Sequence, residues 1–368
     1  MSNSKISTKE AISIILSIIV AHTLVCLPRN IVTSTKSATL INLIYVGIIA
    51  LLIVFLIIKL LKRFPSNDII DISDYLGGPV FKKIIGVLFI GYFIFSSSIL
   101  LRNFCECLKI VYYPMTSLVF IILTFIIAIL ITLNFSFKTS AKVNLLILPV
   151  VIFSVLFIFI ANFRHFSIGN IFPILGDGIF NTFVTGIGNL SAFSGIVFIY
   201  FLPPYLEEPQ KLKKISVTAI GIAIIYLILC VSIILLLFSS LLKADEILPL
   251  YSAAQYIEFG VFFQRLESIF LLIWMIQMAC YFAITLHFTL HIFKKIANLS
   301  DSKPLIFPLG LLMFAVSFLP KNYAVSKFLE VEIYPYLVFG IGFFISISIL
   351  ILANMKKRKK KVEVQNNE

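Results

Sequence analysis

The chain has 368 residues, of which 60% are hydrophobic and 13% are charged, and its mean hydropathy is +1.07. A soluble domain carries about 25% charged residues, so this composition excludes a soluble globular protein and predicts a polytopic membrane protein. The formal net charge of +13 does not indicate a nucleic-acid partner, because the basic residues are gathered in short stretches between apolar segments.

Apolar runs long enough to cross a bilayer, about 20 residues each, follow one another along almost the whole chain. We predict ten segments, at about 10–28, 38–61, 83–109, 114–133, 139–161, 179–203, 215–241, 261–293, 304–320 and 333–354. They form one transmembrane domain, residues 10–354, between an N-terminal tail (1–9) and a basic C-terminal tail (355–368). The stretch 244–258 is too polar to span a membrane, and we expect a short interfacial helix there.

The distribution of lysine and arginine predicts the orientation of these segments. Most of the 30 basic residues lie in stretches that share one side of the membrane with both termini. Cytoplasmic loops carry such an excess, so we expect both termini in the cytoplasm. The basic tail 356–361 can also contact anionic lipid. No cleavable signal peptide is expected, because the first apolar run has no small-residue cleavage site.

The first and sixth segments each contain a small or polar interruption before a Leu-Pro pair. The interruptions are Ala-His-Thr at 21–23 and Ser-Ala-Phe-Ser-Gly at 191–195. Ten helices divide into two halves of five with opposite topology, the inverted repeat of many transporters. We expect both helices to break, near 21–24 and 191–196, and to lie side by side, because irregular backbone at membrane depth lines an enclosed cavity. The alternative is that these groups bond within the bundle, as Thr23 would to a carbonyl one turn earlier.

The order and spacing of several short motifs resemble those of the spore germination permeases, the B subunits of nutrient germinant receptors within the amino acid–polyamine–organocation superfamily. The resemblance covers essentially the whole chain. The motifs that carry it are Leu27-Pro28-Arg29, Arg63-Phe64-Pro65, Gly91-Tyr92-Phe93, Arg102 with Glu106, Phe201-Leu202-Pro203 and the run Gln264 to Trp274 (QRLESIFLLIW).

The resemblance implies an all-α polytopic fold with a five-plus-five inverted repeat and broken first and sixth helices. It also implies that a small, amino-acid-like nutrient binds at mid-membrane between segments 1, 3, 6 and 8. Matched position by position, the ligand-binding residues would be Ala21, His22, Thr23, Tyr92, Ser96, Ser194, Gly195, Tyr281 and Thr285. The family usually has Gly-x-Gly where this chain has 21–23, and some relatives have an acidic residue at the position of Val197. These departures bear on the ligand more than on the fold.

The function that the resemblance implies is nutrient binding in the spore inner membrane, which triggers germination. The implied partners are a larger membrane subunit with soluble domains and a lipoprotein. Two alternatives stay open, an amino-acid transporter coupled to protons or sodium and an ion-conducting channel subunit. We find no phosphate-binding glycine loop, nucleophile triad or cofactor fingerprint, so we expect neither an enzyme nor a cofactor. No metal site is expected either, because His287 and His291 lack the glutamate of a metalloprotease helix.

Four charged residues lie in or near the ends of segments 3 and 8: Arg102, Glu106, Arg265 and Glu267. Intramembrane charges are costly and tend to pair inside the bundle. Arg102 and Glu106 share a helix face at a spacing of four, and a contact between Glu106 and Arg265 would join the two helices. Such a network would be either an outer gate or a fixed packing contact.

Overall fold

The computed structural model describes residues 5–25, 27–238, 248–257 and 266–366, and these form helices without any β-strand. Within them, six helices are long and apolar enough to cross a membrane, and two further apolar helices are shorter. The first and sixth predicted segments are in neither group, because each of them is interrupted and does not form one intact helix. Together the long, short and interrupted helices account for the ten predicted segments.

The first half of the chain forms α1 (Thr8–Thr23), α2 (Leu27–Thr35), α3 (Thr39–Leu61), α4 (Ile69–Val111), α5 (Leu118–Leu133) and α6 (Phe137–Ala161). The second half forms α7 (Ile179–Phe183), the 3-10 helix η4 (Thr185–Phe193), α8 (Ile196–Ile199), α9 (Leu212–Leu237), α10 (Pro249–Gln255), α11 (Leu266–Ile296) and α12 (Ile306–Ser317). The last helix runs through α13 (Tyr323–Phe328), the π-helical turn η8 (Leu329–Ile333), α14 (Tyr334–Leu337), a second π-helical stretch η9 (Val338–Ile345) and α15 (Ser346–Asn366).

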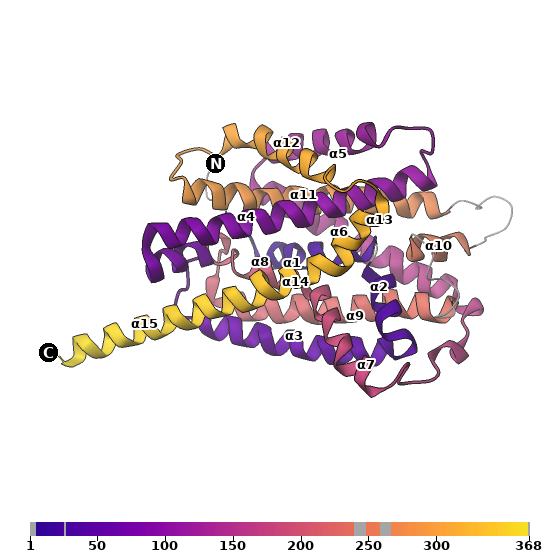
Figure 1. Ribbon diagram of the computed structural model, residues 1–368, viewed down its shortest axis with the longest axis horizontal. Helices are drawn as coiled ribbons and strands as arrows, with labels where there is room; N and C mark the ends of the chain where they lie inside the picture. The colour runs from indigo at the N-terminus through magenta and orange to yellow at the C-terminus, as the bar shows by residue number, and fades with distance from the viewer. Residues whose placement is uncertain (1–4, 26, 239–247, 258–265, 367–368) are drawn as a thin grey trace.

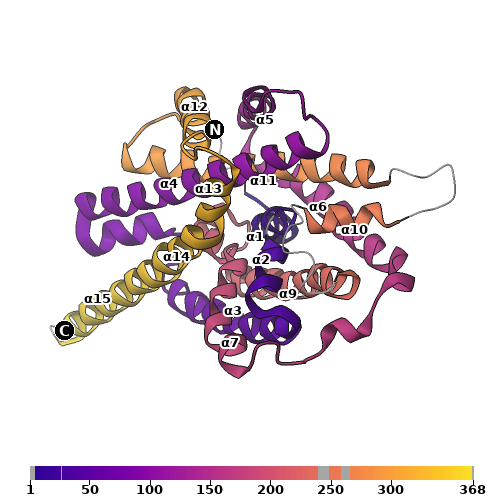
Figure 2. The same cartoon turned by 45° about the vertical axis from the view of Figure 1, so that its right-hand side comes forward.

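The two interrupted helices lie at the centre of the bundle. Figure 2 shows α1 and α2 in the middle, with α4, α6 and α11 on one side and α3 and α9 on the other. The helices α5 and α12 run side by side at the rim (Figure 1). Large apolar side chains such as Phe120 and Leu311 are exposed on these rim helices, as expected for surfaces that face lipid. Polar side chains therefore gather inside the bundle.

The first helix breaks at the end of the predicted interval. A capping box between Ser7 and Glu10 starts α1, and the helix continues through the interruption at 21–23 to end at Thr23. The Thr23 hydroxyl donates to the Ile19 carbonyl at 2.6 Å, so this side chain bonds within its own helix. Leu24 and Val25 form a turn after this helix, and α2 begins at Leu27.

The sixth helix breaks where the sequence predicted. Ser194 and Gly195 separate η4 from α8. A Cβ atom on Gly195 would overlap the Ile15 carbonyl oxygen and lie 2.9 Å from Cγ2 of Ile18. The backbone of the sixth helix can approach α1 this closely only because glycine has no side chain. The two broken helices are therefore neighbours, as expected.

Two predicted boundaries were wrong. The third segment was expected to begin at 83, but α4 starts at Ile69. Non-helical backbone at Gly78, whose φ is 72°, separates these first residues from the part of α4 that holds the predicted segment. Asp68 caps this helix by accepting from the backbone N–H of Ile70 and Asp71, both at 3.0 Å, a pattern hidden in a stretch that otherwise looks like a polar loop. The last helix was expected to begin at 333, but it begins at Tyr323, which moves Glu330 from a predicted loop into a helix.

A candidate ligand-binding pocket at the helix breaks

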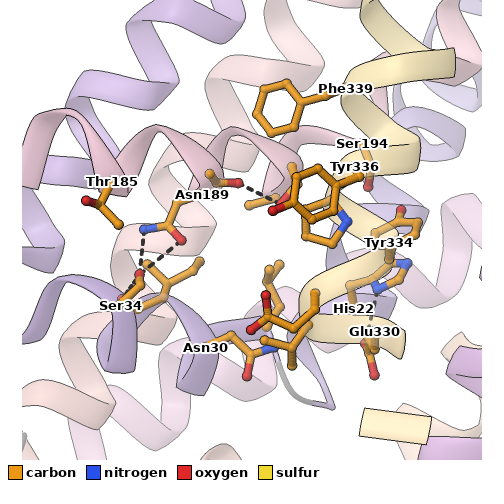
Figure 3. Close-up of a pocket in the computed structure, with 18 residues that line it drawn as sticks. His22, Asn30, Ser34, Thr185, Asn189, Ser194, Glu330, Tyr334, Tyr336 and Phe339 are labelled. Carbon is orange, nitrogen blue, oxygen red and sulfur yellow. Dashed lines mark hydrogen bonds and ion pairs between the residues drawn. The ribbon is translucent and has the colours of Figure 1, made fainter. Parts of the chain in front are cut away.

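A cavity of about 370 Å³ lies beside the two breaks, between α2, η4 and the last helix (Figure 3). We call it the break pocket; its floor includes His22, Ser194, Glu330 and Tyr334, and its mouth includes Ser34, Thr185 and Tyr336. The floor residues are buried and the mouth residues are exposed. A cavity of this size and mixed polarity matches sites for small molecules.

Asparagine side chains hold the wall of the pocket mouth together. Asn189 on η4 donates to the Ser34 hydroxyl at 3.0 Å and to Oδ1 of Asn42 at 2.8 Å. Asn42 on α3 in turn donates to the carbonyl oxygens of Thr182 and Gly186 at 2.7 and 3.0 Å. These bonds satisfy backbone groups that the 3-10 helix leaves unpaired, so they position the first half of the sixth helix against α2 and α3.

His22 is the most distinctive side chain of the floor. It is 4% exposed, and its ring stacks on Tyr334 with centroids 4.8 Å apart. Its Nδ1 lies 3.4 Å from Oε1 of Glu330, the contact drawn as a dashed line in Figure 3. Its Nε2 is buried and has no hydrogen-bond partner within the described part of the chain. Such a group is costly unless a ligand or water satisfies it.

Glu330 is a functional candidate that the sequence analysis missed. It is 6% exposed, and Asn103 on α4 donates to its second carboxylate oxygen. Glu330 lies in the π-helical turn η8, and turns of this kind are frequent at functional sites. The predicted start of the last helix at 333 left Glu330 outside the membrane. Its spacing of four from Tyr334, which places the two on one helix face, was the available signal.

The structure places the nine predicted ligand-binding residues in three groups. His22 and Ser194 line the break pocket. Tyr92, Ser96 and Tyr281 form a polar layer next to the floor, where Ser96 Oγ lies 3.3 Å from Tyr281 Oη and Tyr92 Oη lies 3.5 Å from Tyr334 Oη. The remaining four are buried in helix packing: Ala21, Thr23, Gly195 and Thr285. Thr285 donates to the Tyr281 carbonyl in its own helix.

A layer of buried aromatic rings closes the bundle beyond this polar layer. Phe198 stacks on Phe288 with ring centroids 5.0 Å apart, and Phe93 lies 5.7 Å from Phe198 and 5.5 Å from Phe201. Along α11 the ring of Phe288 falls between Tyr281 of the polar layer and His291, which contacts Asp68. The break pocket is therefore separated from the end of the bundle that carries Asp68 by packed side chains.

A charged cluster lies at the far end, between the start of α4 and the end of α11. Asp68 is fully buried and accepts from His291 Nε2 at 2.7 Å and from Lys295 Nζ at 2.6 Å. Lys295 also bonds Asp71 at 2.6 Å. Burial alone would raise the pKa of Asp68, but the hydrogen bond from His291 and the charges of His291 and Lys295 together hold this pKa well below its ordinary value. We call this group the Asp68 cluster.

The predicted charge network is described only in part. Arg102 forms an ion pair with Glu106 at 2.8 Å and lies over the ring of Phe318 at 5.3 Å. Glu267 is buried at the start of α11, while Arg265 lies outside the described residues, so the contact between Glu106 and Arg265 stays a prediction.

His287 contacts Ser140 whereas His291 contacts Asp68, and the described residues contain no group of three potential metal ligands.

Two broken helices packed side by side inside a helical bundle define a transporter-like membrane fold. Two solved structures show it over most of the chain. The inward-facing conformation of Mhp1 has a TM-score of 0.63 at 12% identity, covering 95% of this chain and 76% of that protein. A substrate-bound, outward-open Na+-coupled sialic acid symporter has a TM-score of 0.64 at 14% identity, covering 94% and 78%. At such identities the likeness concerns the fold alone.

Sequence comparison identifies the family. The sequence profile described as spore germination protein (spore permease) matches residues 5–325. In Bacillus subtilis (strain 168), spore germination protein YndE is 26% identical, over 87% of this chain and 88% of the relative. Spore germination protein A2 of the same organism is 27% identical, over 86% and 87%. The chain belongs to the spore germination protein family, which confirms the family and the transporter-like fold expected from the sequence.

Proposed function

We propose that this protein is the nutrient-binding membrane subunit of a spore germinant receptor, and that the nutrient binds in the break pocket. The observation that carries the proposal is the buried pair of His22 and Glu330 on the floor of a cavity between the two broken helices. Buried polar groups with unused hydrogen-bonding capacity favour a ligand that can satisfy them. The family supplies the biological setting, since the relatives are named as spore germination proteins.

The mechanism that follows is a shift between arrangements of the bundle. The pocket contacts both broken helices and the last helix, so a ligand bound there changes the relative stability of their arrangements. The aromatic layer blocks passage towards the Asp68 cluster, which favours a receptor that registers binding over a permanently open path. The basic residues predict cytoplasmic termini, and the family resemblance implies the spore inner membrane. The pocket mouth then faces away from the cytoplasm. Partner subunits, a larger membrane subunit and a lipoprotein, would receive the change.

An amino-acid transporter is the second candidate, because the neighbouring solved structures include a Na+-coupled symporter. Transport would require the aromatic layer around Phe288 to open during each cycle. Uptake of a radiolabelled amino acid by vesicles that contain the purified protein distinguishes the two functions. A receptor binds the amino acid without accumulating it in the vesicle, whereas a transporter accumulates it.

The test of the pocket is a variant that fills it. Ser194→Leu places a larger side chain on the floor, so the ligand clashes while the lipid-facing surface is unchanged. Spores with this variant should need at least tenfold more nutrient for a half-maximal response, which corresponds to a loss of about 1.4 kcal/mol. Thr124→Leu on α5 is the matched control, because Thr124 is exposed on the rim and bonds its own helix. Unchanged dose–response curves at equal immunoblot signals would place the ligand site elsewhere.

A further inference from the structure

We propose that Glu330 binds a protonated amine of the nutrient, and that His22 gives up its contact with Glu330 when the amine arrives. The inference rests on the proposed function and deepens it, because it names the residue that would hold the amine of an amino-acid-like nutrient. Nutrients with a free ammonium group would bind, whereas sugars, nucleosides and hydroxy acids would not. Among the described residues, the site consists of Glu330, its present partners His22 and Asn103, and the neighbouring Tyr334.

The carboxylate of Glu330 has hydrogen-bonding capacity that its present partners do not use. An ionised carboxylate offers about four acceptor positions, and the structure shows Glu330 with one contact from Asn103 and one from His22. The contact with His22 is 3.4 Å long, whereas charge-assisted N–H···O bonds are typically about 2.7–2.9 Å. A compact ammonium group can therefore make a shorter bond to Oε1 than the imidazole makes.

Arg102, the positively charged residue next to Asn103 on α4, is paired with groups other than Glu330. Arg102 precedes Asn103 in the chain, but its guanidinium bonds Glu106 at 2.8 Å and the Ser317 carbonyl at 3.4 Å. A buried carboxylate is costly unless a positive or hydrogen-bonding group compensates it. This cost gives Glu330 a reason to prefer a cationic ligand over a neutral one.

Hydroxyl groups around Glu330 suit an ammonium ion. Tyr334 lies on the same helix face as Glu330 and is buried on the pocket floor, and its hydroxyl oxygen can accept a hydrogen bond from an ammonium. An ammonium has three N–H donors, and Ser194 offers a hydroxyl acceptor on the same floor. A metal ion fits less well, because no third potential metal ligand joins His22 and Glu330 among the described residues.

His22 acquires a role of its own in this exchange. Its ring stays stacked on Tyr334 at 4.8 Å, while the release of Nδ1 from Glu330 frees a second nitrogen beside the already unpartnered Nε2. Both nitrogens can then contact the remainder of the ligand. The exchange replaces the contact between His22 and Glu330 by contacts through the ligand, while the stacking of His22 on Tyr334 remains.

The experiment measures binding to the purified full-length protein by thermal unfolding. The probes are the twenty standard amino acids, the 2-hydroxy acids that match alanine, valine and leucine, and glucose and inosine, which carry no ammonium. Wild-type protein should be stabilised by at least one amino acid and should prefer an amino acid to its matching hydroxy acid. Stabilisation by hydroxy acids, glucose or inosine alone, or by no amine at all, overturns the proposal.

Glu330→Gln keeps the shape of the side chain and removes its charge. The preference for an amino acid over its hydroxy acid should fall about 10- to 100-fold, as expected for the loss of one hydrogen bond to a charged group. Glu208→Gln is the control, because Glu208 is exposed, pairs with Lys211 at 2.6 Å and does not line the break pocket, and it should keep the preference. Glu330→Asp keeps the charge, so it should retain the preference with weaker binding, which keeps the test decisive if Glu330→Gln does not fold.

The outcome also separates this inference from the proposed function. If Ser194→Leu weakens the response but Glu330→Gln keeps the preference for the amine, the pocket is the ligand site and Glu330 is not its anchor. If neither variant changes binding, the ligand lies outside the break pocket and both proposals are wrong.

Discussion

Nδ1 of His22 lies 3.4 Å from Oε1 of Glu330, although 308 positions separate the two residues in the chain. The contact joins the last turn of α1 to the π-helical turn of the last helix on the floor of the break pocket. A ligand that disturbs it therefore acts at once on a broken helix and on a helix whose far end extends from the bundle as α15 (Figure 1). This relationship offers a physical route from ligand binding to a change of arrangement.

Removing the imidazole should destabilise the protein through Glu330. His22→Phe keeps a ring that can stack on Tyr334 but leaves the buried carboxylate without its histidine partner. Leaving a buried hydrogen-bonding group without its partner costs about 1–3 kcal/mol, so less of this variant should accumulate in membranes. The double variant His22→Phe/Glu330→Gln should recover much of that loss. Immunoblots and thermal unfolding in detergent measure both, and equal stability of the single and double variants would argue against the pair.

The Asp68 cluster predicts a specific dependence of stability on pH. The folded state holds the pKa of Asp68 well below its ordinary value, which is about 3.9 in an unfolded chain. The resulting stability is fully present above that unfolded value and is lost as pH falls through the lower folded pKa. The melting temperature of the wild type should therefore fall more steeply below about pH 4 than that of Asp68→Asn.

The control for this measurement is Asp177→Asn, at an exposed aspartate in the loop before α7, whose exposed ion pair with Lys36 contributes little to stability. It should keep the pH profile of the wild type, and the Asp68→Asn variant should be less stable at neutral pH because His291 and Lys295 lose a charged partner. Parallel profiles for the wild type and Asp68→Asn would show that the cluster contributes no pH-dependent stability.

Gly195→Ala should separate the two broken helices. The added methyl group would overlap the Ile15 carbonyl oxygen and press on Ile18, and overpacking of this kind costs about 1–3 kcal/mol. Gly91→Ala on α4 is the control, because nothing lies within 4 Å of a Cβ atom built there. The control should be neutral or slightly stabilising, since alanine favours a helix over glycine. Comparable melting temperatures for both variants would contradict the close approach of the sixth helix to α1.

Arg102 and Glu106 should stabilise the protein only when both are present. Either Arg102→Met or Glu106→Gln leaves a charge inside the bundle without its partner at 2.8 Å, so each single variant should accumulate less than the wild type. The double variant should accumulate better than either, because no unpaired charge remains. If the pair is a gate, the double variant should also respond to nutrient at an altered concentration. Normal dose–response curves of a well-accumulated double variant would instead identify a fixed packing contact.

The amino-acid sequence by itself determined the class of protein, the approximate helices and the two interruptions. Apolar length, the placement of lysine and arginine, and local groups such as Ser194 and Gly195 act within one helix turn, so they can be read along the chain. The family motifs then indicated the fold, and they pointed to His22 and Ser194, which the structure places on the pocket floor. The sequence could not show where the cavity lies relative to Tyr92, Ser96 and Tyr281.

Only the tertiary structure decided which polar groups meet. Glu330 was missed because two glutamates and a proline near residue 333 resemble a loop, whereas π-helical turns let the last helix continue through them. Asp68 was read as part of a loop because its partners His291 and Lys295 lie more than two hundred positions away. Contacts of this kind depend on how whole helices pack across the bundle. The residue pattern within a single segment cannot predict this packing. The free energy of each buried charge depends on groups from other helices.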